Sequence, residues 1–69
     1  MKISARNTLP GIVRSLELGA VNAEVTIELA PSLRIVSIIT LDAARSLNLK
    51  PGDRAYAVIK ASSVMVGID

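Results

Sequence analysis

At 69 residues the chain has room for one domain, which we expect to span residues 1–69. It contains no cysteine and no histidine, which excludes disulfides, thiolate metal sites and the commonest metal ligand and general base. Its net charge is only +2 and its single aromatic residue is Tyr56, so a nucleic-acid partner is disfavoured, because such surfaces combine many cations with stacking aromatics.

The apolar share of the composition is high, at 51%. A chain this short buries only a modest fraction of its surface, so we expect part of the apolar surface to be buried between the subunits of a homo-oligomer. No apolar run approaches the roughly 20 residues of a membrane span, and the N-terminus lacks the apolar segment of a signal peptide. We therefore expect a cytoplasmic protein with no membrane partner.

The N-terminal segment, residues 2–6, is strand-like in composition. The stretch Thr8-Leu9-Pro10-Gly11 separates it from the rest of the chain, and we interpret this stretch as a swivel. In a homo-oligomer such an arm can add to the sheet edge of a neighbour. We therefore predict an N-terminal strand that is exchanged between subunits.

The next part of the chain alternates between apolar and polar residues, which predicts strands over residues 12–18 and 23–29 and a third β-branched strand over 33–39. The alternation breaks at residues 40–47, where Thr40 suits an N-cap and the spacing predicts a helix of about two turns. A type II turn over Lys50-Pro51-Gly52-Asp53 follows.

Two further strands are predicted at the end of the chain, over residues 54–60 and 63–68. Five strands with one short helix between the third and the fourth is the order of an OB-type barrel, so we predict a mainly all-β fold, an OB-like five-stranded β-barrel. The residues expected in its core are Val25, Ile27, Leu29, Ile39, Val58 and Val66. Tyr56 should be partly buried, with its hydroxyl near a polar partner.

The sequence contains no motif typical of an enzyme. It has neither a nucleophile–base pair, nor a catalytic carboxylate pair, nor a glycine-rich phosphate loop. We therefore predict a binding protein that is not an enzyme and holds no metal as a free cation.

Hydroxyl groups and fixed cations gather in three short segments: Ser4-Ala5-Arg6-Asn7, Thr40, and Lys60-Ala61-Ser62-Ser63. Each has an ordinary explanation, since Arg6 can pair with a carboxylate across an interface, Asn7 can form an Asx-turn and Thr40 can simply cap a helix. Together they offer the donor fork, compact charge and rotatable hydroxyls that a tetrahedral dianion requires.

These segments resemble the molbindin family, the small Mop-type molybdate-binding proteins with a TOBE-like OB-fold domain. The blocks that carry the resemblance are Ser4-Ala5-Arg6-Asn7, Gly19 to Val25, and Val58 to Ser62, in this order and nearly end to end. The resemblance implies a homohexamer, built as a trimer of dimers, that holds molybdate, with tungstate as an alternative ligand, at subunit interfaces. It also implies a role in the intracellular storage and homeostasis of molybdenum.

By position, the resemblance implies an oxyanion site completed by two chains, with the ligands Ser4, Arg6, Thr40, Lys60, Ala61 and Ser62. It also suggests a second candidate site with backbone donors from Gly19, Ala20, Val21 and Asn22, although this stretch equally fits a hairpin turn capped by Asn22. The family often carries a serine three residues after the threonine, where this chain has Ala43. We therefore expect one hydroxyl donor fewer and a weaker affinity.

Three rival functions lead to different expectations. The first is an oxyanion-sensing module that works with a molybdate transporter or regulator, because the same module occurs as an appendage of such proteins. The second is an OB-fold nucleic-acid binder, which predicts aromatic residues on the barrel face and a larger positive charge, and neither is present. The third is a structural assembly protein whose basic pockets are incidental, and it predicts an oligomer that is indifferent to oxyanions.

Overall fold

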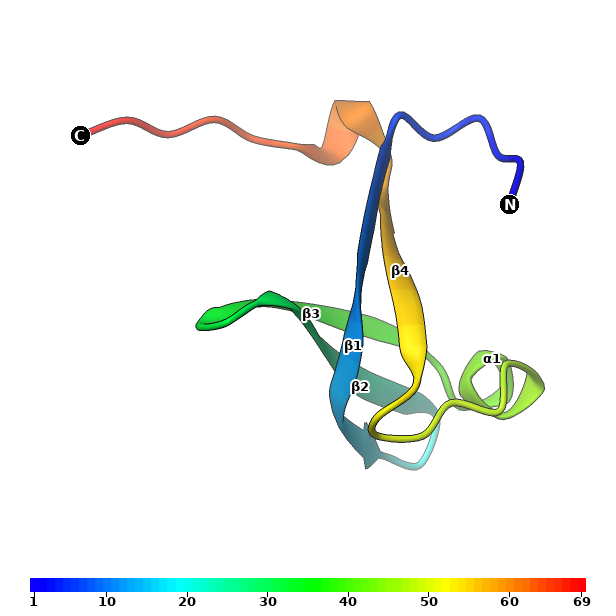
Figure 1. Cartoon of the computed structure of the whole chain (residues 1–69). Coiled ribbons are helices and arrows are strands. Elements are labelled where there is room, and N and C mark those ends of the chain that lie inside the picture. The colour runs from blue at the N-terminus through cyan, green and yellow to red at the C-terminus, as the bar shows by residue number, and fades with distance from the viewer.

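Four antiparallel strands form most of the computed structural model, which describes residues 1–69 (Figure 1). These strands form a curled sheet in the order β3-β2-β1-β4, with a short helix α1 before β4 and a 3-10 turn η1 after it. The bounds of these elements are β1 Asn7–Leu18, β2 Asn22–Ala30, β3 Leu33–Thr40, α1 Leu41–Ser46, β4 Arg54–Ile59 and η1 Ala61–Ser63. The predicted first four strands, and the helix between the third and fourth, are confirmed.

Strand β1 joins the two halves of the sheet. Its C-terminal half pairs with β2, from Ile12↔Glu28 to Leu18↔Ala23, and its N-terminal half pairs with β4, from Asn7↔Ile59 to Ile12↔Arg54. The register shifts at a bulge in the β1–β2 ladder, and bulges increase the bend and twist of a strand. This bend lets one long strand serve both β2 and β4, which curls the sheet.

The predicted swivel at Thr8–Gly11 is wrong, because these residues lie inside β1. Pro10 is tolerated there since this half of β1 has a neighbour on one side only, so its missing N–H breaks no ladder on the other side. Gly11 is required by close packing: a Cβ at this position would lie 2.6 Å from the carbonyl oxygen of Glu28. The Pro-Gly pair therefore marks where β1 passes from β2 to β4.

Helix α1 begins where the sequence predicts. Thr40 is its N-cap, and the Thr40 Oγ1 atom accepts a hydrogen bond of 3.0 Å from the backbone N–H of Ala43. Asp42 lies in the first turn, where its negative charge interacts favourably with the positive end of the helix dipole. Ala44 is buried against the sheet. Neither α1 nor η1 has the length or the apolar run that crossing a bilayer takes.

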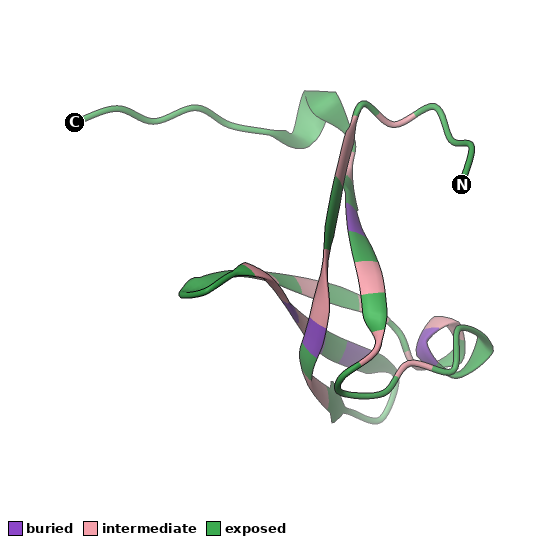
Figure 2. Cartoon of the chain, in the orientation of Figure 1, coloured by how far each residue is buried: buried purple, intermediate pink, exposed green.

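The core of the single chain is small and consists of apolar side chains of modest size (Figure 2). The buried residues are Val13, Ala23, Val25, Ile27, Ala44 and Ala57. The predictions for Val25 and Ile27 are confirmed, while Leu29 and Ile39 are partly buried and pack against this core. The predictions for Val58 and Val66 are wrong for the single chain, because these residues are 49% and 91% exposed. Tyr56 is also more exposed than predicted, at 55%, and its hydroxyl makes no hydrogen bond.

Both ends of the chain differ from the five-stranded prediction. Residues 2–6 form no strand, and the predicted fifth strand over 63–68 is instead the end of η1 followed by an extended tail. The tail leaves the sheet on one side and the N-terminal arm on the other (Figure 1). Neither segment pairs with the four strands, and a strand needs a ladder partner for its backbone N–H and C=O groups. The single chain is therefore an incomplete barrel, and exchange of its ends between subunits stays a prediction.

Candidate functional site

A hollow lies where the N-terminal arm passes the end of β4. Its lining consists of Ser4, Ala5, Arg6, Val58, Lys60, Ala61 and Ser62. The structure thus brings together five of the six predicted oxyanion ligands, although they come from opposite ends of the chain. None of the lining residues is acidic, so the fixed charge of the hollow is positive.

The ladder between β1 and β4 explains why these distant segments meet. Asn7, the first residue of β1, pairs with Ile59, the last residue of β4. Arg6 and Lys60 directly follow this last pair on the two strands, and both line the hollow. Two cations that share one hollow repel each other. An anion between them would remove this repulsion.

The turn after β4 adds backbone donors to the hollow. Ser63 N–H donates to the carbonyl of Lys60 at 2.8 Å, which folds residues 61–63 into η1. The first N–H groups of a helical turn have no acceptor within the turn, which leaves those of Ala61 and Ser62 free of such bonds. The hydroxyls of Ser4 and Ser62 complete a set that consists of cations and neutral donors.

The hollow is open in the single chain. Its volume is about 640 Å³, whereas one water molecule takes up roughly 30 Å³ and a tetrahedral oxyanion only a few times that. All the lining residues except Ala5 are exposed. The single chain therefore supplies the charge and the donors, but it does not enclose a small ion.

Thr40, the sixth predicted ligand, lies elsewhere. It pairs with Asn22 at the end of β3, the end of the sheet opposite the hollow, and α1 begins directly after it (Figure 1). The Thr40 Oγ1 atom accepts the Ala43 N–H, which leaves the hydroxyl proton available for donation to another group. The plain N-cap explanation is confirmed for the single chain, and Thr40 can reach a hollow like this one only in another copy.

The second candidate site, residues 19–22, is a hairpin turn in this structure. Gly19 N–H donates to the carbonyl of Asn22 at 2.8 Å, and the carbonyl of Val21 accepts from the N–H of Leu41 at 2.8 Å. Gly19 and Asn22 line a shallow hollow together with two carboxylates that face each other across the ladder, those of Glu17 and Glu24. A dianion bound here would meet two like charges within the same chain.

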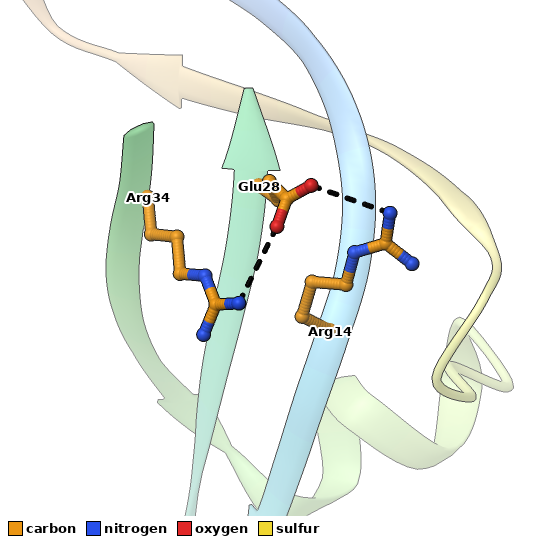
Figure 3. Close-up of polar contacts among 3 residues, drawn as sticks. All are labelled: Arg14, Glu28 and Arg34. Carbon is orange, nitrogen blue, oxygen red and sulfur yellow. Dashed lines mark hydrogen bonds and ion pairs between the residues drawn. The ribbon is translucent and has the colours of Figure 1, made fainter. Parts of the chain in front are cut away.

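A second group of charges, on the strands β1, β2 and β3, contrasts with the hollow. The carboxylate of Glu28 accepts from Arg14 at 3.3 Å and forms an ion pair with Arg34 at 3.4 Å (Figure 3). These are the ion pairs of the chain, so Arg6 and Lys60 have no carboxylate partner. Arg6 has no carboxylate partner within the chain, so the interpretation of Arg6 as half of an ion pair would require a carboxylate of another chain.

Two lining residues of the hollow are absent from the predicted ligands: Ala5, which lies between Ser4 and Arg6, and Val58, which sequence reasoning assigned to the core. Val58 lies two residues before Lys60, so strand alternation places the two side chains on one face of β4. The signal was present, but alternation alone does not say whether an apolar side chain faces its own core or the surface.

Together, the curled sheet and the cationic hollow define a small OB-like β-domain in which the N-terminal arm and the end of β4 line one positively charged hollow. The chain belongs to the TOBE domain family, which matches residues 3–66. The resemblance drawn from the sequence blocks is thereby confirmed.

The relatives of this chain are binding proteins by name. It is 52% identical over 69 residues to the "Probable molybdenum-pterin-binding protein" of Haemophilus influenzae, and the match covers 100% of both chains. It superposes with a TM-score of 0.91 on a molybdate-binding protein from Sporomusa ovata, at 35% identity and with 99% of this chain and 100% of that chain covered. These matches confirm the OB-like, mainly β fold class.

A third similar protein is the cytoplasmic molybdate-binding protein ModG, in a structure with molybdate bound. The TM-score is 0.93 and the identity 51%, and the match covers 100% of this chain and 49% of the ModG chain. The present chain therefore spans about half the length of ModG.

Proposed function

We propose that this protein binds molybdate, with tungstate as an alternative ligand, and holds the ion without chemical conversion. The observation that carries the proposal is the hollow in which Arg6 and Lys60 meet without any carboxylate. The similarity to molybdate-binding proteins, one of them with molybdate bound, supports the choice of ion.

Each ligand has a distinct role in this proposal. Arg6 offers a planar fork of N–H donors and Lys60 a compact charge, so two cations balance the two negative charges of the ion. Ser4 and Ser62 donate through rotatable hydroxyls, and the N–H groups of Ala61 and Ser62 add fixed dipoles. Molybdate is a dianion at neutral pH, so binding needs no proton transfer.

Enclosure of the ion requires a second chain. Sulfate is also a tetrahedral dianion, so charge alone does not separate the two ions, and only the size of a closed cavity can do so. The open hollow of the single chain provides no such cavity. We therefore propose that two chains complete one site and that Thr40 is contributed by the second chain.

Two exposed rows of side chains support this arrangement. On β3, every second residue from Val36 to Thr40 is exposed, and Val36 and Ile38 are 58% and 67% exposed. On β4, Tyr56 and Val58 are exposed, and the same alternation continues to Lys60 just after the strand. Packing the first row of one copy against the second row of another would bury both apolar rows and bring Thr40 close to Lys60.

The ends of the chain support a larger assembly. In the tail, Met65, Val66 and Ile68 are between 91% and 94% exposed, and at the other end Met1 is 74% exposed. Apolar side chains this exposed are typical of surfaces that a partner covers. We propose a homohexamer, built as a trimer of dimers, in which the N-terminal arm is exchanged and the tail finds its ladder in a neighbouring copy.

The cellular role that fits a holding site without catalytic groups is storage and homeostasis of molybdenum in the cytoplasm. A site that binds and releases the ion unchanged would buffer its free concentration. We keep residues 19–22 as a second candidate site in the assembly. There, donors from other copies would have to offset the repulsion between the ion and the carboxylates of Glu17 and Glu24.

Isothermal titration of the purified protein with molybdate, tungstate and sulfate tests the proposal, with the mass of the assembly measured in parallel. We expect saturable binding of molybdate and tungstate at about one or more ions per chain, in a hexamer, and no saturable binding of sulfate. A folded oligomer that releases no heat with any of the three ions would contradict the proposed function and favour a purely structural assembly.

A further inference from the structure

The ladder between β1 and β4 ends at the proposed site. Its last pair is Asn7↔Ile59, and the two cations of the site come directly after it, Arg6 on one strand and Lys60 on the other. Any change in how this pair closes therefore changes the separation between the two cations.

Two positive charges without ion-pair partners lie at this end of the ladder. Arg6 and Lys60 directly follow the last pair and line one hollow, and neither has a carboxylate partner, so their like charges repel each other. The ends of strands open more readily than their middles. In the ion-free protein, repulsion thus acts at the point where the ladder is weakest.

A side chain ties the two strands together at this same point. The Nδ2 atom of the partly buried Asn7 donates to the carbonyl oxygen of Ile59 at 3.4 Å. It is the one side-chain hydrogen bond between β1 and β4, since the others join β1 to β2, cap α1 and close the turn before β4. The bond is longer than the usual range of roughly 2.7–3.2 Å and is therefore weak.

We propose that Asn7 is a positioning residue for the molybdate site: its amide holds the end of the β1–β4 ladder closed against the repulsion between Arg6 and Lys60. Asn7 does not line the hollow, so it acts through the two cations and not on the ion. By keeping both cations in place before the ion arrives, it lowers the ordering cost of binding. This inference rests on the proposed function.

The test compares Asn7→Leu, which removes the amide at similar side-chain size, with Thr8→Ala on the next residue of β1. Thr8 pairs with Val58 in the same ladder, but its side chain makes no hydrogen bond to β4. Each variant is titrated with molybdate, and backbone hydrogen exchange at the end of the ladder, residues 7–8 and 58–59, is measured without the ion.

For Asn7→Leu we expect binding of molybdate roughly three- to tenfold weaker than in the parent, the range that one modest hydrogen bond supplies. Exchange at residues 7–8 and 58–59 should be faster in this variant even without the ion. Thr8→Ala should match the parent in both measurements, and Asn7→Gln, which keeps a primary amide, should recover part of the affinity. If Asn7→Leu does not fold, Asn7→Ser replaces it in the same comparison.

Two results would overturn the inference alone: a parent that binds molybdate with an Asn7→Leu variant that binds it equally well, or an equal loss of affinity in Asn7→Leu and Thr8→Ala. The second result would mean that β1 is merely weakened. A folded parent that binds no oxyanion would overturn the proposed function and, with it, this inference.

Discussion

Two groups of cations in this small protein have opposite surroundings. On the sheet, Arg14 and Arg34 both pair with the carboxylate of Glu28, which is itself only partly exposed. Arg6 and Lys60 instead line one hollow that contains no carboxylate (Figure 3 shows the first group). The difference teaches that positive charge alone does not indicate an anion site in this chain. The candidate cations for an anion are two that lie together in one hollow and have no acidic partner.

Deletion of residues 1–7 removes the part of the hollow that the N-terminal arm contributes. Of the changes considered, it should have the largest effect on molybdate binding. The deletion takes away Ser4 and Arg6 and the arm that we propose to be exchanged between subunits. We expect molybdate binding to be lost and the mass of the assembly in solution to fall. A truncated protein that remains a hexamer and still binds molybdate would contradict both strand exchange and the proposed site.

Arg6→Ala and Arg14→Ala compare the two groups directly. Loss of a desolvated charge contact costs on the order of 2–5 kcal/mol of binding free energy, so titration of Arg6→Ala should show a large loss of molybdate affinity. Lys60→Ala should behave like Arg6→Ala. Arg14→Ala should keep the parental affinity, because Arg14 contacts Glu28 on the sheet. Equal losses in Arg6→Ala and Arg14→Ala would mean that overall charge, not the hollow, attracts the ion.

Gly11→Ala changes the part of β1 that lies between the ion-paired cations of the sheet and the hollow, where β1 passes from β2 to β4. The added Cβ would lie 2.6 Å from the carbonyl oxygen of Glu28 and from the Cγ2 atom of Ile27, so the strands must shift. We expect the free energy of unfolding to fall by about 1–3 kcal/mol, the usual cost of overpacking, measured by denaturant titration. The control is Ser46→Ala at an exposed position of α1 that makes no side-chain hydrogen bond, and its free energy of unfolding should stay within about 0.5 kcal/mol of the parent.

Glu28→Gln should have the smallest effect. It removes the charge that pairs with Arg14 and Arg34, whose side chains are 46% and 58% exposed. Exposed ion pairs contribute little, so the free energy of unfolding should fall by at most about 1 kcal/mol. Molybdate affinity should stay at the parental value in the same titration. A marked loss of molybdate affinity would show that the ion-paired group on the sheet contributes to binding, which would contradict the comparison.

The strands and the helix could be predicted because their signals are local. Alternation over residues 23–29 places Val25 and Ile27 in the core, and Thr40 caps the helix that follows β3. The Pro10-Gly11 pair was misread as a swivel, because sequence alone shows a strand breaker but not the one-sided pairing and close approach that require these residues.

The site could be predicted only in part, and the residues that were placed wrongly share a physical reason. The resemblance selected five residues that the structure brings together in one hollow. Val58 and Val66 were assigned to the core, because alternation separates two faces of a strand but does not distinguish a chain's own core from a surface that a neighbour covers. Thr40 lies at the end of β3, away from the hollow, and the sequence of one chain carries no distance between residues of two copies.

The most direct test is the location of molybdenum in crystals grown with molybdate, from its anomalous scattering. We predict an anomalous peak between Arg6 and Lys60 of one chain, within hydrogen-bond reach of the Thr40 hydroxyl of another. A peak only at the turn beside Glu17 and Glu24, or only on the sheet near Arg14 and Arg34, would contradict the central claim that the unpaired cations at the chain ends hold the ion.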